Sequence, residues 1–267
     1  MQPDIDILGL PLKTFGLLFG LAFVAAGLIL ARRLKELSKP VDWAYEIIFS
    51  GLVGGVIGSK LYYVAQNYDS GDSLLGNVFS GSGLVWYGGA IGGAIGVLLW
   101  ARRHDMLGVG LLDLCAAPLA MGYAIGRVGC QISGDGDYGD AWDGPWAMAY
   151  PNGAVPIDVP VHPTPIYEAL TMALLAWGLW QMRDALRPGV LFAVYLAGSG
   201  LERFLVEFVR RNDEAFLGLT APQLQSLALV VAGVVWLIVS ARGGGLRREP
   251  GPGPRAPVGG GRSAVTA

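Results

Sequence analysis

Charge is scarce in this chain of 267 residues: Lys, Arg, Asp and Glu make up 15% of it, against about a quarter in soluble globular domains. Hydrophobic residues make up 53%, and the mean hydropathy is +0.48. Several apolar runs of roughly 18 to 20 residues match the thickness of a bilayer core. The composition therefore excludes an ordinary soluble domain, and the net charge of −2 gives no indication of nucleic-acid binding.

Cysteine and histidine are also rare, with two residues of each. Cys115 and Cys130 do not form a disulfide framework, and whether they meet depends on the fold. His104 and His162 are predicted on opposite sides of the membrane, which excludes a site of several histidines. The stretch "GDGDYGD" fails as a calcium loop, because an EF-hand that starts at its first aspartate has tryptophan at the twelfth position. We expect no metal and no cofactor.

The apolar runs predict an all-α integral membrane protein with seven transmembrane helices, at residues 14–31, 44–64, 84–101, 107–125, 165–182, 188–208 and 222–240. The first run is not read as a cleaved signal peptide, because its basic cluster "ARRLK" follows the apolar residues. Most Lys and Arg residues fall in the loops 32–43, 102–106 and 183–187 and in the tail after 240. The positive-inside rule then predicts an outer N-terminus and a cytoplasmic C-terminus.

We expect one transmembrane domain over residues 1–241, with an extra-cytoplasmic cap at about 126–164 that covers the site. The Gly/Pro/Arg-rich tail, 242–267, is expected to be disordered. The second and third spans carry glycines at the small-xxx-small spacing, in "GLVGGVIG" and "GGAIGGAIG". This spacing predicts close helix packing, and a groove for an acyl chain is the alternative.

Polar residues gather at the predicted outer ends of the spans. Arg203, Glu207 and Arg210 have the spacing i, i+4, i+7, so they share one face of a helix. That face does not suit lipid and should line the bundle interior or a water-filled cleft, although a purely structural buried ion pair is the other interpretation. Arg127 closes the fourth span.

Four segments resemble the motifs of the prolipoprotein diacylglyceryl transferase family, in order, over roughly residues 12 to 240. "GLVWYGGAIGG" is similar to the family's F-H-G-G-L-I-G, and "GRVGCQISGDGDYG" to its G-R-x-G-N-F-x-N-G-E-x-x-G. "GPWAMAYP" with "HPTPIYEAL" is similar to P-W-x-M-x-F-P with H-P-S-Q-L-Y-E. "ERFLVEFVRRND" is similar to F-R-F-x-V-E-F-x-R-x-P-D.

The resemblance implies a transferase of the bacterial plasma membrane that works without a cofactor, on the periplasmic or outer face. Its substrates would be the membrane lipid phosphatidylglycerol, which gives up its diacylglyceryl group, and preprolipoprotein signal peptides, whose lipobox cysteine accepts it. Guanidinium groups suit the negative charge of the departing phosphate. The family's signature glutamate matches Asp135, with Asp137 as an alternative because one residue is inserted. The residues so implied are, as catalytic, Arg127, Arg203, Asp135 and Tyr87 and, as substrate-binding, Glu207, Arg210, Tyr167, Glu168, Gly134 and Gly139.

Several positions depart from the family pattern. Tyr87 replaces the motif histidine, and Cys130 replaces the first signature asparagine. A neutral tyrosine, with a reference pKa near 10, is a poor base at pH 7, so Asp135 or another carboxylate would have to accept the proton. Two alternatives follow: a family paralogue that transfers the group to a different acceptor, or a non-catalytic protein that binds or transports phospholipid.

Overall fold

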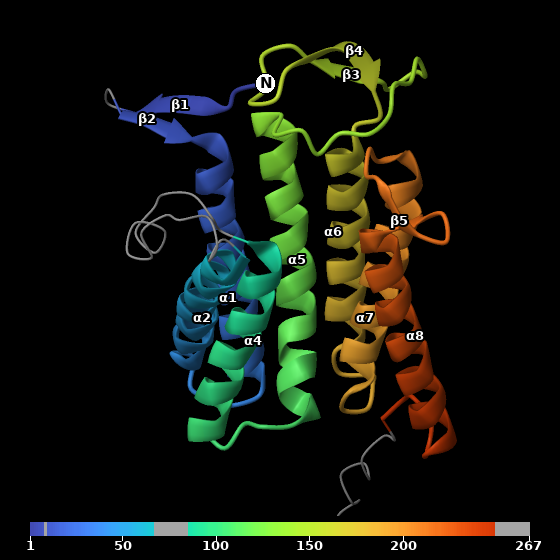
Figure 1. Ribbon diagram of the computed structural model, residues 1–267. Helices are drawn as coiled ribbons and strands as arrows, with labels where there is room; N and C mark the ends of the chain where they lie inside the picture. Colours follow the sequence, from blue (N-terminus) through green and yellow to red (C-terminus); the bar gives the residue numbers. More distant parts are fainter. Residues whose placement is uncertain (8–9, 67–84, 249–267) are drawn as a thin grey trace, which may run out of the picture.

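The computed structural model describes residues 1–7, 10–66 and 85–248, and within these ranges the chain forms seven α-helices (Figure 1). Each helix coincides with one predicted apolar run. By length and hydropathy, four of these described helices, α1, α2, α5 and α8, are able to cross a membrane. The helices are α1 (Thr14–Glu36), α2 (Trp43–Gln66), α4 (Trp86–Arg103), α5 (Val109–Ser133), α6 (Thr164–Met182), α7 (Val190–Val206) and α8 (Ala221–Arg242), and the 3-10 helix η1 (Glu207–Val209) follows α7 directly.

Three short antiparallel ribbons, which the predicted all-α class omits, lie outside the described helices, one before α1 and two in connections between helices. They occupy the end of the bundle at which the N-terminus lies (Figure 1). The chain there is not helical, so its backbone groups pair across ribbons instead. The fold is therefore mostly helical rather than all-α. The ribbons are β1 (Asp4–Ile7) with β2 (Leu10–Lys13), β3 (Met148–Tyr150) with β4 (Ile157–Val161), and β5 (Glu214–Phe216) with β6 (Leu219–Thr220).

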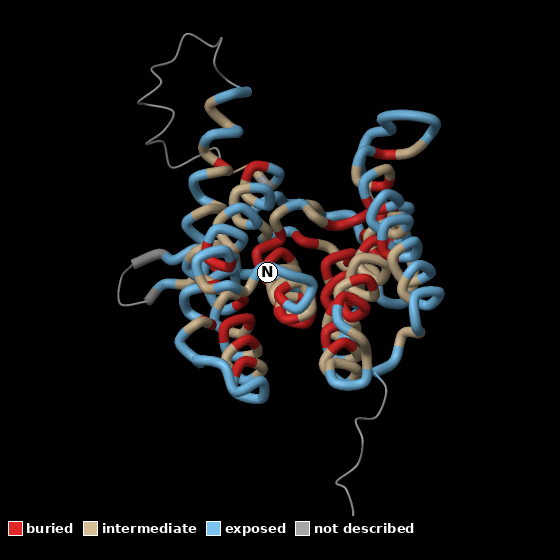
Figure 2. Tube along the Cα trace, turned by 90° about the horizontal axis from the view of Figure 1, so that it is seen from below, coloured by how far each residue is buried: buried red, intermediate tan, exposed pale blue. Residues whose placement is uncertain are grey.

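The outer surface of the bundle is apolar. Figure 2, which views the bundle from below, shows buried positions on the inner sides of the helices and exposed positions around the rim. Large side chains on that rim are exposed for more than half of their surface, among them Leu28, Phe49, Leu61, Leu170 and Leu174. A surface of this kind is costly in water and stable in hydrocarbon, as expected of a membrane protein.

Helices α2 and α4 pack backbone against backbone through their glycines. A Cβ atom added to Gly92 would collide with the carbonyl oxygen of Gly54, and one added to Gly58 with that of Gly88. Only residues without a side chain allow this approach. The prediction of close packing is confirmed, and these glycines leave no groove for an acyl chain between the two helices.

Helix α5 lies between α1 and α6 (Figure 1). Its Asp113, which interrupts the fourth apolar run, accepts hydrogen bonds from the backbone N–H groups of Gly189 (2.6 Å) and Phe192 (2.9 Å). These donors belong to the N-terminus of α7, where a negative charge is favoured. Asp113 therefore caps a neighbouring helix.

The predicted tail is described only as far as residue 248. Its described part contacts the connection between α6 and α7: Arg187 N donates to Leu246 O, and Arg248 N donates to Ala185 O, both at 2.9 Å. Residues 249–267, which make up most of the predicted disordered tail, lie outside the described residues.

Candidate active site

Glu168 is the centre of a charged cluster at the end of the bundle that carries the ribbons. It lies in the first turns of α6 and is fully buried, with 0% exposure. Its Oε1 accepts hydrogen bonds from the hydroxyl of Tyr123 (2.9 Å) and from Nη1 of Arg203 (3.2 Å). Its Oε2 lies 3.2 Å from Nε of Arg127 and 3.3 Å from Nη1 of Arg210. One carboxylate thus holds three guanidinium groups from α5, α7 and the residue after η1.

Asp137 joins two of these arginines. Its carboxylate pairs with Arg127 and, at 2.5 Å, with Nη2 of Arg210. Its carbonyl oxygen accepts from Thr164 Oγ1 (2.5 Å) and from Arg210 Nη1 (3.1 Å), which fixes the loop after α5. Burial alone would raise the pKa of the Asp137 carboxyl, but the charges of Arg127 and Arg210 outweigh it and hold the pKa below its ordinary value.

Glu207 completes the arrangement. It pairs with Nη2 of Arg203 at 2.8 Å and lies 3.8 Å from Nε of Arg210. Asn212 and Thr220 donate to its Oε1 at 2.6 and 2.7 Å. The predicted shared face of Arg203, Glu207 and Arg210 is present, although α7 ends at Val206 and the face continues into η1. We call Arg127, Arg203, Arg210, Glu168, Asp137 and Glu207 the arginine cluster.

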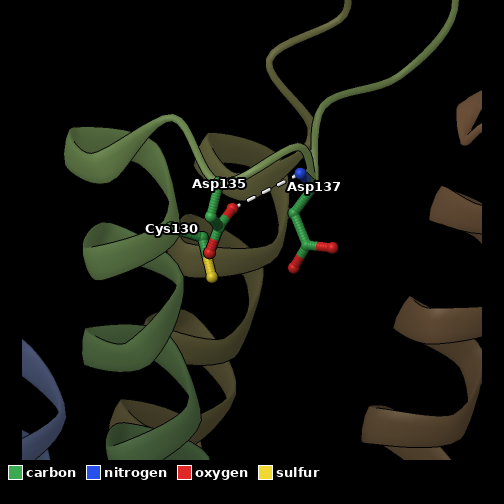
Figure 3. Close-up of side chains that lie close together, drawn as sticks. All are labelled: Cys130, Asp135 and Asp137. Carbon is green, nitrogen blue, oxygen red and sulfur yellow. Dashed lines mark hydrogen bonds between the residues drawn. The ribbon is translucent and has the colours of Figure 1, made fainter. Parts of the chain in front are cut away.

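The structure separates the two aspartates of the signature. Figure 3 shows Asp135 beside Cys130, with the backbone N–H of Asp137 donating to its Oδ1 at 3.3 Å. Asp137, rather than Asp135, pairs with the arginines. Ligand atoms of Cys130, Asp135 and Asp137 lie within 4.8 Å of one another, but the oxygens of Asp137 already bind two guanidinium groups. The positive charges of these guanidinium groups do not favour a metal cation among Cys130, Asp135 and Asp137.

Tyr87 lies at the start of α4, and 39% of its surface is exposed. Its hydroxyl accepts a hydrogen bond from Nε2 of Gln225 on α8 at 2.6 Å. Its ring centroid lies 6.4 Å from that of Tyr62 on α2. The structure therefore brings the predicted Tyr87 together with α2 and α8, whereas Arg127, Arg203, Arg210, Glu168 and Glu207 meet in the arginine cluster.

The remaining predicted residues surround the cluster. Gly134 ends α5 with a positive φ of 60°, and a Cβ there would lie 2.7 Å from the Cα of Gly153. A Cβ at Gly139 would collide with the carbonyl oxygen of Val209. Both glycines therefore permit close contact between segments of this chain. Tyr167 accepts a hydrogen bond from Nε1 of Trp146 at 2.7 Å and lines a neighbouring cavity.

Tyr123 and Glu202 belong to the site and are missing from the predicted set. Tyr123 precedes Arg127 by four residues, and the guanidinium lies 4.9 Å from its ring centroid. This i, i+4 spacing is a usable sequence signal. Glu202 directly precedes Arg203, and its burial, with 8% exposure, becomes visible only in the fold.

Comparison with known proteins agrees with the motifs that build this cluster. The family described as prolipoprotein diacylglyceryl transferase matches residues 4–239. The chain belongs to the prolipoprotein diacylglyceryl transferase family. Among relatives of that family, the phosphatidylglycerol–prolipoprotein diacylglyceryl transferase of Clostridium tetani is 30% identical, over 88% of this chain and 96% of the relative. The transferase of Pseudomonas entomophila is 31% identical, over 88% of this chain and 94% of the relative. That of Methylobacillus flagellatus is 34% identical, over 72% of this chain and 74% of the relative.

Three of the four segments that resemble this transferase family supply the arginine cluster. They contribute Arg127 and Asp137, then Glu168, then Arg203, Glu207 and Arg210. The remaining segment, "GLVWYGGAIGG", contains Tyr87 and glycines of α4. Of the two departures from the family pattern, Tyr87 lies away from the arginine cluster, whereas Cys130 Sγ lies 3.8 Å from Nη1 of Arg127.

Proposed function

We propose that this chain transfers the diacylglyceryl group of phosphatidylglycerol to the lipobox cysteine thiol of preprolipoproteins. The relatives carry this reaction in their names. The observation that carries the proposal is the arginine cluster, in which three guanidinium groups meet around one buried carboxylate. Planar, permanently charged donors of this kind suit a phosphodiester.

All seven helices would cross the plasma membrane, with the N-terminus outside and the C-terminus in the cytoplasm. The predicted cytoplasmic loops hold most of the basic residues, and they lie at the helix ends opposite to the arginine cluster. The cluster would then work on the outer side of the membrane, where the signal peptide of a translocated preprolipoprotein presents its cysteine.

The phosphodiester of the lipid would take the place of Asp137. Of the three carboxylates in the cluster, Asp137 has the most exposed side chain, at 33%, whereas those of Glu168 and Glu207 are fully buried. It also lies on a loop rather than in a helix. Its two oxygens join Arg127 and Arg210 much as two phosphate oxygens would.

The chemistry then exchanges one bond for another. The cysteine sulfur attacks the carbon of the diacylglyceryl group that carries the phosphodiester oxygen, a C–S bond forms, and the bond between that carbon and the oxygen breaks. Glycerol phosphate leaves with the bonding electron pair. Negative charge grows on its phosphate, where Arg127, Arg203 and Arg210 stabilise it.

The thiol proton needs an acceptor, because the thiolate is the nucleophile. Asp137, once released from Arg127 and Arg210, loses the charges that hold its pKa down and is the better-placed acceptor. Asp135, beside Cys130, is the second candidate (Figure 3). Replacing each in turn by asparagine separates them, since only the true acceptor's replacement removes the acid limb of the pH–rate profile.

The direct test is transfer from labelled phosphatidylglycerol to a lipobox peptide by the purified full chain. Arg127→Ala should lower the rate by about two to three orders of magnitude. Arg211→Ala is the matched control, because Arg211 adjoins Arg210 but pairs loosely with Asp140 (3.8 Å) outside the cluster. It should stay within about twofold of the wild type.

Three outcomes would contradict the proposal. Equal rates in Arg127→Ala and Arg211→Ala would show that the arginine cluster takes no part in the reaction. Binding of phosphatidylglycerol without transfer would favour a lipid-binding protein, and transfer to other thiols but not to the lipobox peptide would favour a different acceptor.

A further inference from the structure

A second feature lies beside the arginine cluster: a cavity of about 440 Å³ with aromatic walls, between the start of α6, the end of α7 and the chain that precedes α6. Trp142 stacks on His162, with ring centroids 4.3 Å apart and planes 10° from parallel. The ring of Trp146 lies 5.1 Å from that of Trp142. Trp146 donates to the hydroxyl of Tyr167, and His162 Nδ1 lies 3.3 Å from the same oxygen. The side chains of Trp146, Tyr167 and His162 are thus linked by hydrogen bonds, and ring surfaces make up much of the wall.

Glu202 is the only charged residue among those that line this aromatic cavity. It lies on α7, and 8% of its surface is exposed. Within the described part of the chain its Oε1 has no hydrogen-bond partner. An unpaired buried carboxylate oxygen is costly, so this oxygen calls for a donor from outside the chain.

Carboxylates outnumber guanidinium groups around Glu202. Glu202 interacts electrostatically with Glu168 and with Arg127, Arg203 and Arg210. Among the described residues, Arg127, Arg203 and Arg210 form ion pairs with Glu168, Asp137 and Glu207, and none of the three pairs with Glu202. Four carboxylates therefore stand against three guanidinium groups.

An unpaired carboxylate beside tryptophan and tyrosine rings matches one ligand chemistry, a primary ammonium group. The ring faces attract a cation, tryptophan most strongly. The N–H groups of an ammonium also supply the donor that the Glu202 oxygen lacks, in a charge-assisted hydrogen bond. A phosphate fits poorly here, because the aromatic cavity is lined by no basic residue other than His162.

The surface below the aromatic cavity indicates that the ammonium comes from a lipid. Leu170 and Leu174 follow Tyr167 along one face of α6, and each is exposed for more than half of its surface. Leu205 on α7 lines the cavity and is similarly exposed. A headgroup in the cavity would leave its acyl chains against these apolar side chains.

We propose that the aromatic cavity binds the ammonium headgroup of an aminophospholipid, next to the arginine cluster and distinct from it. The site would hold a second lipid class beside the proposed donor phosphatidylglycerol. It does not depend on transfer activity, and it can be tested by binding alone.

The experiment measures binding of dioctanoyl phosphatidylethanolamine and dioctanoyl phosphatidylglycerol to the purified full chain by titration calorimetry in a non-ionic detergent. Glu202→Gln keeps the shape and removes the charge. It should weaken binding of the ethanolamine lipid by about tenfold or more, and that of the glycerol lipid by less than about twofold. Trp142→Leu, which removes a ring and keeps the charge, should weaken the ethanolamine lipid by several-fold.

Thr171→Val is the matched control, because Thr171 lines the same cavity and carries no charge; it should leave both affinities unchanged. Glu202→Asp keeps the charge and should retain the preference. Thermal unfolding in the same detergent identifies variants that do not fold. Should Glu202→Gln be among them, Trp142→Leu and Thr171→Val decide the question.

The proposal fails if wild type binds the two lipids alike, or if Glu202→Gln weakens both equally. A glycerol-lipid preference lost in Glu202→Gln would assign the aromatic cavity to a hydroxyl-bearing headgroup instead. Binding of a lysine-containing peptide with no saturable binding of the ethanolamine lipid would assign it to a protein ligand.

Discussion

Two ionic clusters lie at opposite ends of the bundle and use the same residue types differently. The first is the arginine cluster. The second, which we call the distal cluster, joins α1 to the end of α6: Arg33 pairs with Asp184 at 2.8 Å, and Arg183 contacts both oxygens of Glu36 at 2.9 and 3.0 Å. The acceptor side chains of the distal cluster, Asp184 and Glu36, are 65% and 29% exposed, whereas Glu168, the central acceptor of the arginine cluster, has no exposure.

The difference in burial separates a structural role from a chemical one. Exposed ion pairs gain little because water and salt screen them. Buried charges interact strongly, and they are costly unless every partner is present. The distal cluster resembles an ordinary link between helix ends. The arginine cluster keeps three positive charges in place for a ligand, with Asp137 as the counter-charge that is easiest to displace.

The largest expected effect comes from removing the central counter-charge. Glu168→Gln leaves Arg127, Arg203 and Arg210 with one carboxylate fewer in a buried site. We expect it to lower the free energy of unfolding by about 3–5 kcal/mol. Unfolding by denaturant in detergent measures this, and a loss below about 1 kcal/mol would show that the cluster is solvated rather than buried.

The next effect concerns activity and compares one arginine from each cluster. Arg203→Ala should reduce diacylglyceryl transfer by about 10²–10³-fold, because a donor to the developing phosphate charge is lost. Arg183→Ala, in the distal cluster, should leave the rate within about twofold. A similar loss of rate in both variants would mean that the two clusters do not differ in role.

A smaller effect is expected in the pH dependence of stability. The lowered pKa of Asp137 means that its ion pairs contribute fully above the pKa of an unfolded aspartate, near 3.9, and are lost as the pH falls through the folded value. Asp137→Asn should therefore lower stability by about 1 kcal/mol at pH 7. Wild type and variant should converge as the pH falls below about 4 in thermal unfolding. A constant difference down to pH 3 would contradict the assignment.

The smallest effect is expected in the distal cluster. Glu36→Gln removes the partner of Arg183 at a partly exposed position, and should lower the free energy of unfolding by less than about 1 kcal/mol. Raising the salt concentration should reduce this difference further. A loss as large as that of Glu168→Gln would remove the contrast between the two ends.

Much of the fold follows from local sequence patterns. Apolar runs place all seven described helices, and the small-xxx-small spacing predicts the contact of α2 with α4 through Gly54, Gly58, Gly88 and Gly92. The ribbons are harder to predict from the sequence, because strands of two to five residues show little periodicity. The role of Asp113 depends on a helix end 76 residues away, which no local pattern shows.

The site can be predicted only in part from the sequence. The spacing of Arg203, Glu207 and Arg210 gives their shared face, and the family motifs give Arg127 and Glu168. The choice between Asp135 and Asp137 depends on how the loop turns after Gly134, because a single inserted residue allows either. The burial of Glu202 likewise depends on how the chain before α6 packs against α7.

A structure with bound phosphatidylglycerol tests the central claim most directly. The account predicts the phosphate within hydrogen-bond distance of Arg127 and Arg210, with the Asp137 carboxylate displaced from both. A phosphate bound elsewhere, with Asp137 still paired to the two arginines, would contradict it.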